Sequence, residues 1–202
     1  MHLKPGKSSN RVAQRWGAGH LKPVLTQIMG HFTGGTPIVD LGFGGQAGDA
    51  LGDTYDSIER VGGSNFADSI FGNEFDNVLL GQGGDDSLTG GLGNDVINGG
   101  DGADSIRGDQ DDDILSGNAG DDTFSYIESD SGNDVITDFN ADGDDTIFFS
   151  VSSGVDSLSD LSFAQQGNDL EVSFGTSTIL LLNTDFFTGI DAADFVFEAE
   201  LI

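Results

Sequence analysis

Large apolar residues recur at every ninth position between Gly63 and Ser125. This column holds Ile70, Leu79, Leu88, Ile97, Ile106, Leu115 and Phe124. One residue flanks each of them on either side, and six residues rich in Gly, Asn and Asp precede each triplet. The triplet predicts a very short strand whose middle side chain faces inward, and the polar hexapeptide predicts a turn. We therefore expect the chain to alternate tight turns with three-residue strands.

Two further columns run through the same stretch, which divides without gaps into seven nonapeptides over residues 63–125. Position 1 is always glycine: Gly63, Gly72, Gly81, Gly90, Gly99, Gly108 and Gly117. Position 6 is aspartate in every repeat but the second, which has Asn77: Asp68, Asp86, Asp95, Asp104, Asp113 and Asp122. Two units complete one coil, and coils stacked about 4.8 Å apart form two parallel sheets. The predicted fold is all-β, a right-handed parallel β-roll, or β-solenoid.

The flanks of the repeats predict three further segments of a single domain. Residues 1–37 are basic, contain all three histidines and no acid, and are expected to be a disordered leader. Residues 38–62 resemble the repeats loosely and predict irregular lead-in coils. Residues 126–202 lose the nonapeptide but keep alternating apolar runs, with a hairpin signal at Gln166-Gly167-Asn168. They predict an antiparallel β cap over the open end of the stack.

Charge narrows the classes of function. The chain has 35 acidic and 7 basic residues, and the acids are 29 Asp against 6 Glu. A net charge of −28 excludes nucleic acid and anionic membranes as partners of the body of the protein. There is no cysteine, and no apolar run is long enough to span a membrane. From Asp40 onward the net charge is −33 (35 acids minus 2 arginines), so self-repulsion opposes compaction unless cations bind.

The predicted turns could supply those cations with ligands. Alternate carbonyls of an extended turn point to opposite sides, so positions 1, 3 and 5 face one neighbouring turn and positions 2 and 4 face the other. With the carboxylate of position 6, a cation between two turns finds about six oxygens, which suits Ca²⁺ better than Mg²⁺. Turns 18 residues apart form five pairs, so about five Ca²⁺ ions are expected.

The predicted metal ligands fall into three groups. The carboxylates are those of Asp86, Asp95, Asp104, Asp113 and Asp122, and Asp68 would join a sixth site with one degenerate turn below it, formed by Gly44, Gly45, Gly48 and Asp49. The carbonyls of positions 1, 3 and 5 are those of Gly63, Asn65, Ala67, Gly72, Glu74, Asp76, Gly81, Gly83, Asp85, Gly90, Leu92, Asn94, Gly99, Asp101 and Ala103. The carbonyls of positions 2 and 4 are those of Gln82, Gly84, Gly91, Gly93, Gly100, Gly102, Asp109, Asp111, Asn118 and Gly120.

Departures from the pattern refine these sites. Phe66 and Phe75 occupy position 4, where glycine is expected, so the N-terminal turns should bind weakly. Asp111 also occupies position 4, and aspartate enters the left-handed region more easily than most residues. The side chains of acids outside position 6, such as Asp85 and Asp112, are expected to be solvated turn residues.

The repeats GGLGNDVIN and GGDGADSIR match the pattern G-G-x-G-x-D-x-U-x at every defined position, and the array resembles the RTX, or haemolysin-type calcium-binding, nonapeptide family. The segment SGNDVITDF and the following DGDDTIFFS resemble the region after the last repeat in serralysin-type metalloproteases and mannuronan epimerase calcium modules. That resemblance implies a terminal Ca²⁺ site closed by Asp130, Asp134 or Asp138. It also implies secretion by a type I (ABC transporter) system that recognises the C-terminus, where residues 194–202 place an acid before hydrophobic residues.

No enzyme is predicted. The chain has no HExxH motif, and His2, His20 and His31 lie in the basic leader. The favoured function is a secreted, extracellular, calcium-dependent folding and secretion module. The alternatives are a carbohydrate-binding accessory module or an adhesive or ice-binding solenoid in contact with a cell surface or polysaccharide. Only Arg60 and Arg107 could meet an acidic polysaccharide, and positions 7 and 9 form an irregular outward ladder. Its apolar members, such as Phe71, Val96 and Ile114, are expected to be covered by the cap or the lead-in.

Overall fold

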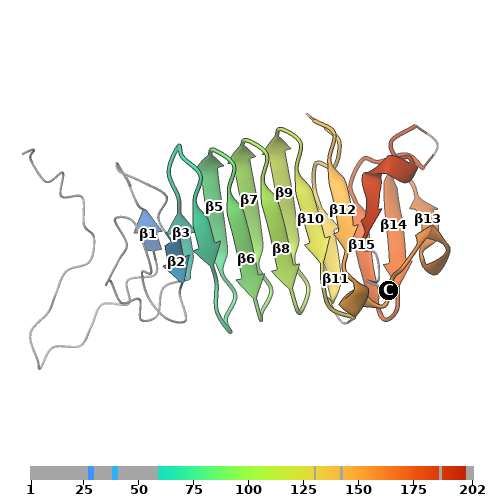
Figure 1. The fold of residues 1–202 in the computed structure, drawn as a ribbon, viewed down its shortest axis with the longest axis horizontal. Helices are drawn as coiled ribbons and strands as arrows, with labels where there is room; N and C mark the ends of the chain where they lie inside the picture. Colours follow the sequence, from blue (N-terminus) through green and yellow to red (C-terminus); the bar gives the residue numbers. More distant parts are fainter. Residues whose placement is uncertain are drawn as a thin grey trace, which may run out of the picture.

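The strands stack side by side along the long axis of the molecule, forming two sheets (Figure 1). This computed structural model describes residues 27–29, 38–40, 59–129, 131–141, 143–186 and 188–198. The larger sheet has the order β1 (Gln27–Met29), β3 (Arg60–Gly62), β5 (Val78–Gly83), β7 (Val96–Asp101), β9 (Ile114–Ala119), β11 (Asn133–Ile136), β15 (Ser177–Leu181), β14 (Asp169–Phe174) and β13 (Ser162–Gln166). The smaller sheet has the order β16 (Phe195–Phe197), β12 (Thr146–Phe149), β10 (Thr123–Tyr126), β8 (Ser105–Asp109), β6 (Ser87–Gly91), β4 (Ser69–Phe71) and β2 (Ile38–Asp40).

From β1 to β12, successive strands along the chain alternate between the sheets, so each coil contributes one strand to each. Neighbouring strands of the roll are parallel, and their register follows the repeat: Leu79 lies opposite Ile97, and Ile70 opposite Leu88. The seven apolar residues of position 8 are all buried, each with 1% or less of its surface exposed. The predicted β-roll is therefore confirmed.

The coils lengthen after the last nonapeptide. Leu115 lies opposite Ile136 and Phe124 opposite Ile147, so the 18-residue spacing grows by three and then five residues. The core continues across these coils, where the Tyr126 ring contacts the rings of Phe149 and Phe174 at centroid distances of 5.7 and 5.4 Å.

The C-terminal cap is antiparallel, as predicted, in the larger sheet. Strand β15 pairs with β11 in parallel, but β14 runs antiparallel to β15 and β13 antiparallel to β14. The hairpin turns at Gly167, which has φ +70°, and Gln166 lies opposite Asp169. Three short 3-10 helices complete this region: η2 (Val151–Ser153), η3 (Leu158–Asp160) and η4 (Ala192–Asp194).

The N-terminal strands begin earlier than the lead-in predicted from sequence. Gln27–Met29 lies within the predicted leader but forms β1 and pairs with β3, while β2 pairs with β4. The rest of the leader, with its three histidines, lies outside the described residues. So do Gly44, Gly45, Gly48 and Asp49 of the degenerate sixth site.

The outward ladder is less irregular than it looked along the sequence. Position 7 is a hydroxyl column on the smaller sheet: Ser69, Ser87, Ser105, Thr123 and Thr146. On the larger sheet it is an aliphatic column: Val78, Val96, Ile114 and Val135. Val96 and Ile114 are 40% and 47% exposed, so the expectation that they are covered is wrong. The reason is that the cap extends the sheets at their ends.

Candidate metal sites in the turns

The side chains of position 6 form a hydrogen-bonded column inside each row of turns. One carboxylate oxygen, Oδ1, accepts the backbone N–H of the position-6 residue one coil earlier: the Asp86 N–H donates to Asp104 at 2.8 Å, and the Asp95 N–H to Asp113 at 2.7 Å. The same bond recurs at every coil from Asp68 to Asp122. These side chains are at most 4% exposed. The bond fixes each carboxylate against the neighbouring turn.

The second oxygen of the same carboxylates has no partner. Within the described residues, Oδ2 is buried without a hydrogen bond in Asp86, Asp95, Asp104, Asp113 and Asp122. An unpaired buried carboxylate oxygen is costly, and burial of charge is normally compensated by a partner or a metal. These five residues are the five whose carboxylates the sequence predicted as ligands. A hard cation fits a donor set of this kind.

Glycine at position 1 gives the carboxylate its space. A Cβ added at Gly90 would meet Asp95 Oδ2 and lie 2.8 Å from the Gly108 carbonyl oxygen. At Gly99 the added atom would meet Asp104 Oδ2 and lie 2.9 Å from the Gly117 carbonyl oxygen. A side chain at either of these glycines would therefore collide with the next coil and with the candidate ligand.

Left-handed backbone shapes the turns at two positions. Position 4 has positive φ in Gly84, Gly93, Gly102 and Gly120, and Asp111 adopts φ +74°, as we expected from aspartate. Sequence reasoning missed that position 2 also needs positive φ, including at Gln82, Asp109 and Asn118. Five central turns have positive φ at position 2, and four of these five residues are Gly, Asn or Asp. This composition was a signal in the sequence, since these residues tolerate the left-handed region best.

Some predicted carbonyl ligands already hydrogen-bond the next turn. The Asp101 carbonyl accepts the Gly84 N–H at 2.8 Å, and the Gly91 carbonyl accepts the Gln110 N–H at 3.1 Å. The Gly63 carbonyl accepts the Gln82 side-chain amide. A carbonyl oxygen has two lone pairs, so one such bond leaves room for a cation. Which carbonyls contact a cation stays a prediction.

Burial makes these carboxylates reluctant to ionise without a cation. It raises the pKa of Asp86 and Asp95 to about 7, of Asp113 to about 8 and of Asp122 to about 6, and it also raises that of Asp104. The backbone N–H bonds oppose this rise in pKa, and neighbouring carboxylates add to it. The turns therefore hold charge that a cation or a proton can neutralise.

The column continues past the repeats. Asp134 Oδ1 accepts the Asp113 N–H, and Asp145 Oδ1 accepts the Asp122 N–H, both at 3.0 Å. Asp138 lies elsewhere, accepting the N–H groups of Gly117 and Asn118. Sequence reasoning missed Asp145, although its segment Gly143-Asp-Asp-Thr-Ile147 repeats the G-x-D-x-apolar pattern of positions 4 to 8. Asp130 lies outside the described residues.

Position 5 forms a second, exposed row of hydrogen bonds. Asp85 Oδ1 accepts the Ala103 N–H at 3.0 Å, and Asp112 Oδ1 accepts the Asn133 N–H at 2.9 Å. These side chains are solvated, as we expected, and they also brace successive turns.

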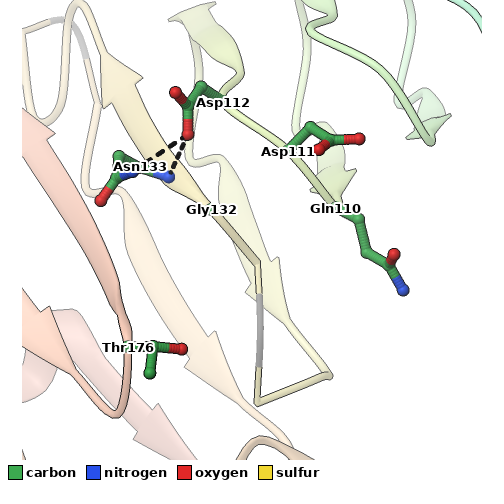
Figure 2. Close-up of a pocket in the computed structure, with 6 residues that line it drawn as sticks. All are labelled: Gln110, Asp111, Asp112, Gly132, Asn133 and Thr176. Carbon is green, nitrogen blue, oxygen red and sulfur yellow. Dashed lines mark hydrogen bonds between the residues drawn. The ribbon is translucent and has the colours of Figure 1, made fainter.

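A polar hollow of about 260 Å³ opens where the coil lengthens, and Figure 2 shows the residues that line it. They are Gln110, Asp111, Asp112, Gly132, Asn133 and Thr176. Asp112 accepts hydrogen bonds from both the backbone N–H and the side-chain amide of Asn133.

Among the described residues no three His, Cys, Asp or Glu side chains converge as metal ligands. A cation in the turns would therefore depend on backbone carbonyls together with the position-6 carboxylates.

Comparison with known proteins identifies the repeats. The family of the RTX calcium-binding nonapeptide repeat (4 copies) matches residues 62–97 and 89–124, less than half of the chain. Residues 62–124 therefore carry nonapeptide repeats of the RTX type. No curated protein matches. Among solved structures, extracellular lipase LipA from Serratia marcescens is similar at 18% identity and a TM-score of 0.30, over 68% of this chain and 39% of the lipase. No helix in the described part of the chain could cross a membrane.

Proposed function

We propose that the roll is a calcium-dependent folding module of an exported extracellular protein and has no catalytic role. Five turns each hold one Ca²⁺ ion between themselves and a neighbouring turn. One observation carries the proposal: five carboxylate oxygens, at a constant spacing along the roll, are buried without a hydrogen-bond partner. Five ions would change the net charge from −28 to −18, since each cancels two negative charges.

Calcium fits these turns better than magnesium does. Ca²⁺ accepts six to eight oxygen ligands in flexible geometry, whereas Mg²⁺ demands a near-ideal octahedron and gives up its water reluctantly. Turns that offer backbone carbonyls and one carboxylate group do not impose octahedral coordination. Zinc is disfavoured because the roll offers neither cysteine nor histidine from the described residues.

The mechanism is linkage between binding and folding. A ligand that binds only the folded state stabilises it in proportion to the logarithm of its concentration. At the low calcium concentration inside cells, the chain would stay expanded by charge repulsion. At the millimolar calcium outside, the ions would bind the folded turns and drive folding, because extracellular modules typically have a Kd of about 10⁻⁴ to 10⁻³ M.

Replacing two central ligands should weaken calcium binding selectively. We expect Asp95→Ala plus Asp104→Ala to lose two of five ions and to raise the calcium midpoint severalfold, as measured by isothermal titration calorimetry. The matched control is Asp85→Ala plus Asp112→Ala, which removes the same charge from exposed carboxylates and leaves the carbonyls in place. Equal loss of ions in both variants would mean that only net charge matters and that the buried carboxylates are not ligands.

Export is the second part of the proposal. It rests on the RTX repeats and on residues 194–202, in which an acid precedes hydrophobic residues. Residues 195–197 also form β16, which pairs with β12. In a bacterium that carries a type I exporter, the chain should appear in the medium, and deletion of residues 194–202 should abolish this. Deletion of residues 1–22 is the control and should leave export intact; a chain retained in the cells in every case would exclude the export role.

Carbohydrate binding and ice binding have less support. Arg107 forms an ion pair with Asp109 at 2.7 Å, so it is already engaged. The hydroxyl column of the smaller sheet has an irregular neighbour at position 9: Phe71, Thr89, Arg107, Ser125 and Phe148. A flat two-column hydroxyl array is therefore missing from the described strands.

A further inference from the structure

The turns at both ends of the roll differ from the five central turns in how position 6 is satisfied. At the N-terminal end, the Ser64 N–H donates to Asp68 Oδ2 at 2.5 Å. In the next turn, the Asn73 N–H donates to Asn77 Oδ1 at 2.8 Å. In both turns the backbone N–H of position 2 therefore donates to the side-chain oxygen that corresponds to the unpaired Oδ2 of the central turns.

At the C-terminal end a backbone N–H also donates to the position-6 carboxylate, but from a residue outside the repeats. The Asn140 N–H donates to Asp145 Oδ2 at 2.8 Å, and the Asp145 N–H donates back to Asn140 Oδ1 at 2.6 Å. Both oxygens of Asp145 are thus paired, because Oδ1 accepts the Asp122 N–H.

The coil that follows the last nonapeptide has a large side chain at position 1, where the repeats have glycine. That residue is Tyr126, the last residue of β10, and its hydroxyl is buried without a hydrogen-bond partner. Burial raises the pKa of Asp134 to about 7, and the nearby Tyr126 hydroxyl opposes this rise. A phenol hydroxyl can donate one hydrogen bond to a carboxylate. The Tyr126 hydroxyl is therefore an available hydrogen-bond donor for Asp134 within the roll.

Backbone conformation separates the central from the N-terminal turns. In the central turns position 2 has positive φ, from +71° at Asn118 to +119° at Gly100. Ser64 and Asn73 are not in this left-handed region. An N–H that points at the carboxylate places the positive end of its dipole where a cation would sit, so the two exclude each other.

We propose that the chain itself terminates the column of cations, with donors at Ser64, Asn73, Tyr126 and Asn140 occupying the four flanking sites. This inference rests on the proposed calcium function and adds which turns bind. The ions number five, and neither Asp134 nor Asp145 closes a terminal calcium site. In the folded roll, the position-6 residues at the ends are then satisfied by the chain itself, while those of the centre depend on metal.

Counting ions tests this inference on the full chain. Native mass spectrometry in Ca²⁺ should show five ions. Asp104→Asn, which keeps the Oδ1 acceptor, should show four, whereas Asp145→Asn and Asp134→Asn should still show five. Asn77→Asp restores the missing carboxylate and should also leave five, which covers the case that an end variant fails to fold.

The outcomes separate the two proposals. A wild-type count of six or seven, a loss of an ion in Asp145→Asn or Asp134→Asn, or a gain in Asn77→Asp would overturn the end donors while leaving the calcium function intact. A wild-type chain with no bound Ca²⁺ would overturn both. A count of five that falls only in the central variant supports both.

Discussion

Removal of calcium is expected to convert the roll from β structure to an expanded coil, and millimolar Ca²⁺ is expected to restore it cooperatively. From Asp40 onward the chain carries a net charge of −33, and five buried carboxylate oxygens have no partner. With a Kd of about 10⁻³ M and about 10 mM Ca²⁺, each site adds about 1.4 kcal/mol to the free energy of unfolding, so five add about 7 kcal/mol. That is comparable with the whole stability of a typical domain.

Far-UV circular dichroism during a calcium titration measures this transition. The Mg²⁺ titration is the control and should leave the chain as a coil. A chain that retains its β signal in excess chelator would contradict the switch. The position-6 column would then act only as a set of turn braces through its Oδ1 hydrogen bonds.

Acid should partly replace calcium in the same measurement. The pKa of Asp86 and Asp95 is about 7 in the cation-free roll, against 3.8 as the ordinary value. Between these values the folded state binds more protons than the unfolded chain, so the free energy of unfolding falls as the pH rises. In metal-free buffer the β signal should therefore grow as the pH falls from 8 towards 4. A metal-free chain that is equally unfolded at pH 8 and pH 5 would exclude this.

The second large effect is expected from one methyl group. Gly99→Ala should lower the free energy of unfolding in calcium by about 3 kcal/mol, the upper range for overpacking. The added Cβ would meet Asp104 Oδ2 and lie 2.9 Å from the Gly117 carbonyl oxygen. A backbone carbonyl inside the stack cannot move away as a flexible side chain can. The same methyl group displaces the candidate ligand, so one ion should be lost as well.

Gly83→Ala is the matched control, because it makes the same change at position 3 of a neighbouring coil. The added Cβ would lie 3.7 Å from its nearest neighbour, the Asp101 carbonyl oxygen, which is an ordinary van der Waals distance. The free energy of unfolding should change by less than about 1 kcal/mol. Denaturant unfolding in about 10 mM Ca²⁺ compares the two variants. Similar losses in both would show that the collision at position 1 is relieved by a shift of the coil.

The repeat made the fold and the five carboxylates predictable. Because each coil stacks on an equivalent coil, glycine at position 1, aspartate at position 6 and an apolar residue at position 8 recur with the repeat. Their period therefore predicts the coil, the candidate ligand and the core. Ile97 is buried, as its column predicted, and Asp95, which its column predicts as a ligand, has a buried oxygen without a hydrogen-bond partner. Even the left-handed Asp111 followed from residue type alone.

Other features depended on contacts between residues whose spacing along the chain does not follow the nine-residue repeat. Asp145 joins the position-6 column only because two longer coils bring it beside Asp122, 23 residues away. The outward residues became uniform only when the alternating strands were sorted into two sheets. The sequence thus determined what repeats every nine residues, because each repeat meets the same environment one coil away. Only the tertiary structure decided how the ends differ, because there the environment changes and the pairing of Ser64 with Asp68, or of Asn140 with Asp145, depends on where the backbone turns.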